Sequence, residues 1–273
     1  MVTIRRLDVA DEALSPPEEL RPAIGLLALA TDANVEAELR TLLPPTVRVY
    51  TNRVVNENPL TVESIHRTAD KITEAGASLI PGQPLDALVY ACTAGTAIIG
   101  TDRVEKLLRR AKPSALCTSP VHASIRAMHR LGIRRPSVLT PNVAEVNAVL
   151  ARCYTSHGFD VRHVMGFEFL EDFDIARVRP ETVVDAAGRS CDPHSDGLLI
   201  CCTTLRVSPV LEEIERVVGR PVVTSNQAIA WELTRELGIA RGPGLGSLSE
   251  MTLDVERERS PGGEIRRGSG VSP

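Results

Sequence analysis

The sequence predicts an α/β fold of two pseudo-symmetric domains, each built on a four-stranded parallel sheet flanked by helices. Three observations lead to this prediction. Short apolar, β-branched segments alternate with amphipathic segments through the middle of the chain, which is the pattern of repeated βαβ units. Hydrophobic residues make up 43% of the 273 residues, enough to bury two cores. The order of the segments also repeats, which indicates a duplicated domain with an active site in the cleft between the copies.

The elements are expected in the following order. Eight apolar segments read as strands: residues 23–30, 47–54, 87–92, 115–119, 137–140, 160–165, 198–203 and 222–225. Eight segments with helical period lie between them: residues 35–43, 62–75, 102–111, 121–131, 143–157, 181–187, 209–218 and 227–237. Most of these helices are directly followed by glycine, the residue that best accommodates a left-handed C-terminal cap.

The predicted strands and helices divide the chain into domains. Residues 21–119 with 227–240 form the first α/β domain, and residues 120–226 form the second. Residues 1–20 are expected to be an N-terminal arm that packs on a neighbouring subunit. Residues 241–273 form a C-terminal extension, with disorder expected from residue 256, because glycine, serine, proline and charged residues dominate it without an apolar period.

Composition excludes several classes of partner. The formal charge of -4 leaves no basic excess to neutralise phosphates, so nucleic acid is not expected as a partner. No apolar segment reaches the roughly 20 residues that span a bilayer, and the first 20 residues are acidic where a signal peptide is apolar. We therefore expect no membrane association and a cytoplasmic location.

The six cysteines are expected to be reduced thiols, because they stand in a long chain that has no signal segment. None forms a C-x-x-C pair, so no metal site is expected. Aromatic residues make up only 3%, which leaves little to stack on a flat cofactor, and none is expected.

The first candidate site is the segment Ala91-Cys92-Thr93-Ala94-Gly95-Thr96, which follows an apolar strand. Ligands of open α/β sheets bind at the carboxyl ends of strands, where backbone N–H groups can face an anion. A helix N-terminus beyond Cys92 would lower the pKa of this thiol from its usual value of about 8.5. A lone cysteine in this place is more often a small buried hydrophobe.

The second candidate site, Cys201-Cys202-Thr203-Thr204, has the same design at the matching place in the second half. Cys92 stands 69 residues after the start of its domain's first strand, and Cys202 stands 65 residues after the start of the corresponding strand. Two such thiols would face each other across the cleft, each near a helix N-terminus, which suits proton transfer on opposite faces of one carbon. Because side chains alternate along a strand, only one of Cys201 and Cys202 can reach the cleft.

Four motifs give the chain its resemblance to a known family. They are Ala91-Cys92-Thr93-Ala94-Gly95-Thr96, Thr140-Pro141-Asn142, Cys202-Thr203-Thr204-Leu205-Arg206 and Pro221-Val222-Val223-Thr224-Ser225-Asn226-Gln227. Through them, residues 21–238 resemble the aspartate/glutamate racemase superfamily. Within it, the chain is similar to the branch that contains maleate cis-trans isomerase, arylmalonate decarboxylase and, nearest of all, the ectoine-utilisation racemase-like proteins.

The resemblance implies roles for individual residues. Cys92 and Cys202 would be catalytic, and Cys201 would be a packing residue. The substrate-binding residues would be Asp32, Thr93, Gly95, Thr96, Asn142, Thr203, Thr204 and Asn226. Two positions depart from maleate isomerase: Asp32 replaces a substrate-binding asparagine, and Asn142 replaces a tyrosine. A maleate dianion would be bound poorly beside the added carboxylate.

The sequence therefore predicts a cofactor-independent racemase or isomerase of a small carboxylated, amino-acid-like substrate, with two-thiol proton transfer at Cα and a possible place in ectoine catabolism. Two alternatives within the family are a maleate-type cis-trans isomerase and an arylmalonate-type decarboxylase. The decarboxylase has one cysteine and a glycine at the other position, whereas both cysteines are present here. An alternative of another class is a non-catalytic protein that binds a small acid between two lobes. A homo-oligomer is expected.

Overall fold

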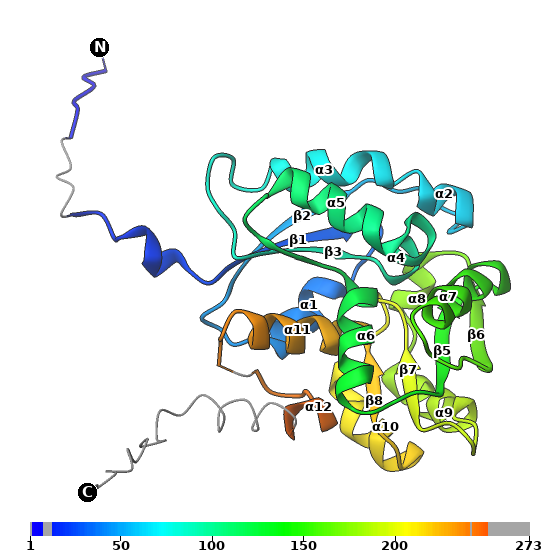
Figure 1. The fold of residues 1–273 in the computed structure, drawn as a ribbon. Coiled ribbons are helices and arrows are strands. Elements are labelled where there is room, and N and C mark those ends of the chain that lie inside the picture. The colour runs from blue at the N-terminus through cyan, green and yellow to red at the C-terminus, as the bar shows by residue number, and fades with distance from the viewer. Residues whose placement is uncertain (1, 8–12, 241, 251–273) are drawn as a thin grey trace, which may run out of the picture.

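The computed structural model describes residues 2–7, 13–240 and 242–250, and it contains the two predicted four-stranded parallel sheets (Figure 1). The strands of the first sheet are β1 (Ala23–Leu29), β2 (Arg48–Val54), β3 (Ala87–Ala91) and β4 (Leu116–Thr118). Those of the second sheet are β5 (Pro136–Asn142), β6 (His163–Phe169), β7 (Gly197–Ile200) and β8 (Val222–Thr224). The fold class predicted from the sequence is confirmed.

The two sheets have the same topology. The strand order is β2-β1-β3-β4 in the first sheet and β6-β5-β7-β8 in the second, with parallel pairing throughout. In each sheet, the chain runs from the central first strand to one edge of the sheet, and from the central third strand to the opposite edge. The carboxyl ends of these two strands flank a switch point, which is where ligands bind in open α/β sheets.

Burial explains why the central strands are continuously apolar rather than alternating. All seven residues of β1 and all five of β3 are buried, because helices cover both faces of the sheet. Gly25 of β1 allows a close approach, since a Cβ at this position would lie 2.7 Å from methyl carbons of both Leu85 and Leu88. The edge strands β2 and β6 are more exposed.

Helices surround the sheets. They are α1 (Val35–Leu42), α2 (Val62–His66), α3 (Ala69–Ala77), α4 (Thr93–Ile99), α5 (Thr101–Ala111), α6 (Pro120–Arg130), α7 (Ala144–Ser156), α8 (Asp172–Ala176), α9 (Pro180–Ser190), α10 (Leu211–Val218), α11 (Ser225–Glu236) and α12 (Ser247–Glu250). Two short 3-10 helices are η2 (Pro17–Leu20) and η3 (Ser208–Val210). None of the helices in the described part of the chain is long and apolar enough to cross a membrane.

Several elements differ from the sequence prediction. The expected helix 62–75 is interrupted at Arg67 and Thr68, giving α2 and α3. Helix α4 begins directly after Cys92, where the sequence predicted the next helix only from residue 102, and a short helix that was not predicted, α8, follows β6. The expected strand 198–203 ends at Ile200, so Cys202 lies in a loop instead of on a strand.

Helix α11 joins the two halves of the chain. It packs against α1 of the first half and against α6, and α6 contacts both α4 and β8 (Figure 1). These contacts place the carboxyl ends of the central strands of both sheets close together. The domain boundaries stay a prediction. Within the N-terminal arm, residues 2–7 are exposed, and the disorder expected from residue 256 concerns residues outside the described part.

Candidate active site

A narrow cavity lies where the carboxyl ends of the central strands of both sheets meet. Leu29 ends β1 and Asn142 ends β5, while Cys92 follows β3 and Cys202 lies in the loop after β7. Thr93, Ala94, Thr203 and Thr204 also line the cavity, together with Asp172 of α8 and the apolar Leu60 and Ile65. Both topological switch points therefore open into one cavity, which contains the two predicted catalytic thiols.

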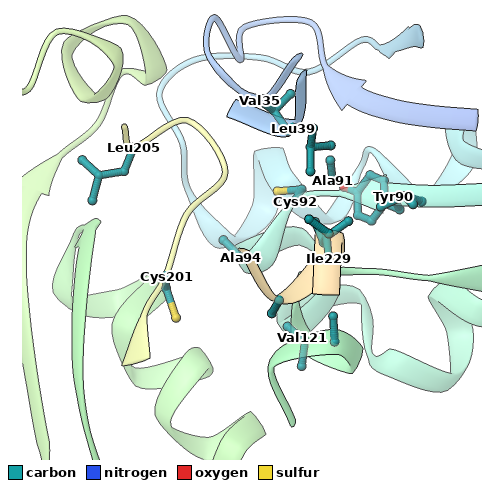
Figure 2. Close-up of a cluster of buried hydrophobic side chains, with 14 of the residues drawn as sticks. Val35, Leu39, Tyr90, Ala91, Cys92, Ala94, Val121, Cys201, Leu205 and Ile229 are labelled. Atoms are coloured by element: carbon teal, nitrogen blue, oxygen red, sulfur yellow. The ribbon is translucent and has the colours of Figure 1, made fainter. Parts of the chain in front are cut away.

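Cys92 is the N-terminal cap of α4. Its Sγ accepts a hydrogen bond from the backbone N–H of Gly95 at 3.1 Å, and its carbonyl accepts one from Thr96 Oγ1 at 2.8 Å. A Cβ at position 95 would contact the Tyr90 hydroxyl and lie 2.9 Å from Cys92 Sγ, so only glycine fits here. Figure 2 shows Cys92 beside Tyr90, which is fully buried in β3.

Cys202 has an unusual backbone. Its φ of 102° is in the region that side chains rarely adopt. The conformation is held by its N–H, which donates to Ser225 Oγ at 3.0 Å and approaches Thr93 Oγ1 at 3.4 Å. These two hydroxyls are themselves 2.8 Å apart. The first residues of α11 and α4 thus fix the backbone of Cys202.

The helix N-terminus beside Cys202 is that of α11, whose first residue, Ser225, accepts from the Cys202 N–H, while the next helical turn along the chain begins only at Ser208. The neighbouring Cys201 is fully buried and does not line the cavity. In Figure 2 the Cys201 sulfur points away from Cys92. Of the two adjacent cysteines, Cys202 is therefore the one that reaches the cavity.

Both thiols have raised pKa values, contrary to the sequence expectation for Cys92. Burial raises the pKa of Cys92 to about 12, and the N–H of Gly95 offsets this only in part. Burial also raises the pKa of Cys202 well above its usual value. The negative charges of Asp172 and Asp32 raise the pKa of both thiols further. Desolvation overrides the helix N-terminus, so both cysteines are protonated at neutral pH.

Two buried carboxylates, Asp32 and Asp172, lie close enough to the thiols to affect their pKa values. Asp32 caps α1: its Oδ1 accepts from the N–H groups of Asn34 at 2.9 Å and Val35 at 3.0 Å, and its Oδ2 accepts from Thr203 Oγ1 at 2.8 Å. Asp172 accepts from the hydroxyls of Thr31 and Thr204. Burial is the main cause that raises the pKa of Asp172 to about 6.

The sequence-predicted residues fall into two groups. Cys92, Cys202, Thr93, Asn142, Thr203 and Thr204 line the cavity. Asp32, Gly95, Thr96 and Asn226 lie behind this lining and hold it in place. Asn226 donates from Nδ2 to the carbonyl of Thr203 at 2.9 Å, while its buried Oδ1 has no hydrogen-bond partner among the described residues.

Sequence reasoning missed three residues at the site. Asp172 lies beyond the predicted end of a strand that the structure extends from residue 165 to Phe169, and the carboxylate had no motif to mark it. Ser225 lies in the motif Pro221 to Gln227, but the resemblance implied a substrate-binding role for Asn226 alone in that motif. Tyr90, immediately before the first cysteine motif, reads as a core residue because its strand is apolar.

The cavity is suited to a small carboxylate beside a reacting carbon. The first N–H groups of α4, at Thr93 and Ala94, have no partner within their own helix and carry the positive end of its dipole. The hydroxyl groups of Thr203 and Thr204, which also line the cavity, already donate to Asp32 and Asp172 and so leave these backbone N–H groups as the donors for a substrate. A carboxylate bound by such donors would acidify its α-hydrogen and would activate a conjugated double bond, in both cases beside a thiol.

Comparisons with known proteins agree with this geometry. The family model described as arylmalonate decarboxylase matches residues 60–249. An arylmalonate decarboxylase from Bordetella bronchiseptica is 31% identical over 136 residues, which are 48% of this chain and only 57% of that protein. A maleate isomerase from Nocardia farcinica is 24% identical over 82% of this chain and 94% of its own length.

Solved structures show the same fold. A Nocardia farcinica maleate cis-trans isomerase mutant, with a covalently bound succinylcysteine intermediate, has a TM-score of 0.76 at 22% identity, covering 83% of this chain and 97% of its own. A liganded mutant of arylmalonate decarboxylase has a TM-score of 0.75 at 24% identity, covering 83% and 98%. Since the family model spans more than half of the chain, this protein belongs to the arylmalonate decarboxylase family, which has an aspartate/glutamate racemase-like fold and includes the maleate isomerases.

Proposed function

We propose that this chain is a cysteine-dependent isomerase of a small carboxylate, in which Cys92 and Cys202 are the reacting groups. One observation carries the proposal: two thiols from matching positions of the duplicated fold line one cavity. A single buried cysteine has a simple structural explanation, but a matched pair facing the same small space does not.

The first candidate reaction is cis-trans isomerisation through a covalent adduct, supported by the similarity to two maleate isomerases. The sulfur of one cysteine, as thiolate, would add to one carbon of a conjugated double bond. The electron pair of that bond would move to the neighbouring carbon, which takes a proton from the other thiol. After rotation about the single bond, the second cysteine, now a thiolate, takes a proton back from the neighbouring carbon. The electron pair of that C–H bond re-forms the double bond, and the C–S bond breaks to return the first thiolate.

The second candidate is racemisation of an amino-acid-like acid by proton transfer, favoured by the placement of thiols on opposite lobes. One thiolate would remove the α-hydrogen, leaving the electron pair in an enolate that the bound carboxylate delocalises. The opposite thiol would deliver a proton to the other face. Decarboxylation and binding without turnover are further outcomes that an assay must separate. A role in ectoine breakdown, a cytoplasmic location and a homo-oligomeric state stay predictions.

The experiment is a screen of small unsaturated acids and small chiral acids by NMR in D2O, combined with mass spectrometry of the rapidly quenched protein. Isomerisation gives the other double-bond isomer and a chain heavier by one substrate. Racemisation gives the inverted acid with one deuterium at Cα and no adduct. Turnover should be lost in Cys92→Ser and in Cys202→Ser, because a hydroxyl is too weak an acid to form the needed anion near neutral pH.

The matched control is Cys201→Ala, which changes the adjacent buried cysteine outside the cavity and should keep turnover. Equal loss of turnover in Cys201→Ala and Cys202→Ala, with both variants folded, would contradict the assignment of Cys202. Full turnover without either cavity thiol would refute the proposed function.

A further inference from the structure

The charge of the cavity is unusual for a site that receives a carboxylate. Apart from the two thiols, Asp172 is the one ionisable side chain among its described lining residues, and that lining contains no lysine, arginine or histidine. Arg53 of β2 lies beside the end of β1 but does not line the cavity. It donates to the carbonyl of Leu29 at 3.1 Å and pairs with Glu36. When Asp172 is ionised, one end of the cavity is therefore negative.

The contacts of Asp172 differ from those of a structural carboxylate. Asp32, nearby, has the usual structural role, because it caps a helix by accepting from two backbone N–H groups. Among the residues that the structure describes, Asp172 accepts only from the side-chain hydroxyls of Thr31 and Thr204, which carry no charge. Only 3% of its surface is exposed, so water does little to compensate the carboxylate.

An uncompensated carboxylate opposes the chemistry of the thiols. It is costly to bury, and its negative charge adds to the burial that already raises the pKa of both thiols. A positive charge placed beside Asp172 would remove both disadvantages at once. It would pair with the buried carboxylate, and it would weaken the field that keeps Cys92 and Cys202 from ionising.

We propose that Asp172 binds a positively charged nitrogen of the substrate, so that this chain acts on small carboxylates that carry an ammonium or amidinium group. The hydrogen bond from Thr204 places this cationic subsite next to the loop of Cys202. The inference rests on the proposed function in one respect, namely that the cavity is the substrate site. Binding of the cation also prepares the thiols to react, which ties their ionisation to the presence of the correct substrate.

The test measures protection of Cys92 and Cys202 from iodoacetamide in the full chain at pH 8, with peptide mapping by mass spectrometry. The competing probes are 2-aminobutyrate, 2-hydroxybutyrate and maleate. The first two have nearly the same shape and differ in charge at the substituent. In the wild-type protein, 2-aminobutyrate should protect at about a tenfold lower concentration than 2-hydroxybutyrate, and maleate should protect least.

Asp172→Asn keeps the shape of the side chain and should remove most of this preference, leaving the two probes within about threefold of each other. If Asp172→Asn does not fold, Asp172→Ser serves the same purpose with a smaller polar side chain. The control is Asp174→Asn on the same helix, where the exposed carboxylate pairs with Arg177, and it should keep the wild-type preference.

Three results would overturn the proposal: protection by 2-hydroxybutyrate or maleate at least as strong as that by 2-aminobutyrate, no protection by 2-aminobutyrate, or a preference that survives both Asp172 variants. The readout is binding and involves no turnover. Failure of the proposed function would show instead as turnover in Cys92→Ser and Cys202→Ser, so the two failures are distinguishable.

Discussion

At the scale of single residues, the backbone of Cys202 has a φ of 102°, a conformation in which any Cβ is strained. Glycine would adopt it without strain, yet the position holds a thiol that lines the cavity. The hydrogen bond from the Cys202 N–H to Ser225 holds the strained backbone in place. This combination is typical of a position that is kept for its chemistry at a cost in stability.

Cys202→Gly should therefore be more stable than Cys202→Ala by about 1 kcal/mol, although both should be inactive. Both variants remove the thiol, and they differ in whether a Cβ must occupy the positive-φ region. Urea unfolding of the two variants gives the difference in free energy. Equal stability, or a less stable glycine variant, would show that the strain is absent in solution.

The buried carboxylate of Asp172 should make stability depend on pH. Burial raises its pKa in the folded state from 3.8 to about 6, so the folded protein holds this proton more tightly than the unfolded chain does. The favourable contribution is complete below pH 4 and is lost as the pH rises to 6. Asp172→Asn should thus raise the free energy of unfolding by about 1–3 kcal/mol at pH 8.

The same substitution should have little effect near pH 4, where the carboxyl group is neutral in both states. Urea unfolding at the two pH values, with Asp174→Asn as the exposed control, measures this. A gain at pH 4 equal to that at pH 8 would mean that folding does not shift the pKa of Asp172.

The two thiols could be found from sequence because they recur at equivalent places, while Asp172 could not. Its importance depends on the path of the chain after β6, which brings it next to Thr31 and Thr204. The raised pKa of Cys92 was also beyond sequence reasoning. A helix N-terminus beyond Cys92 was expected, although from a helix starting at residue 102, but the extent of burial is a property of the assembled fold.

At the scale of elements, α4 is the helix that builds the first half of the site. It supplies the cap at Cys92, the N–H of Gly95 and the hydroxyl of Thr93. The sequence did not predict it because Thr93-Ala94-Gly95-Thr96 has the small and hydroxyl residues of a turn, and glycine and threonine are weak helix formers. Tertiary packing overrides this local preference, since most of the helix is buried.

Gly95→Ala should lower turnover strongly, because the new Cβ would contact the Tyr90 hydroxyl and press on Cys92 Sγ. Removing that hydroxyl in the double variant Gly95→Ala/Tyr90→Phe should restore part of the lost activity. Steady-state kinetics of the wild type, both single variants and the double variant give the coupling between the two positions. Additive losses in the double variant would contradict the proposed contact.

The strands were easier to predict than the helices for a physical reason. A strand buried on both faces is a continuous apolar run whatever its surroundings, and all eight strands were found with shifts of only a few residues at their ends. The errors lie in short helices such as α8 and in the break between α2 and α3. These depend on caps and packing that involve residues far away in the sequence.

At the scale of the whole molecule, duplication explains why one site has two similar halves. Two sheets with the same strand order present the ends of their first and third strands to one cavity. Each thiol follows the third strand of its half, which is why their matched spacing in the sequence predicted their convergence. The loop of Cys202 departs from this symmetry, because it relies on the first residue of α11 and on Thr93 of the other half for its backbone hydrogen bonds.

The measurement that tests the shared cavity most directly is labelling of the native protein with iodoacetate, a small carboxylated electrophile, at pH 9. The alkaline pH compensates in part for the raised pKa values of both thiols. We predict one carboxymethyl group in the cavity, carried by either Cys92 or Cys202, because the first group fills the space in front of the other thiol. Peptide mapping counts this label separately from any label on the partly exposed Cys153 and Cys191. The six cysteines should all react after denaturation. Chains that carry the label on both thiols, or that are labelled first at Cys201, would contradict a single site shared by Cys92 and Cys202.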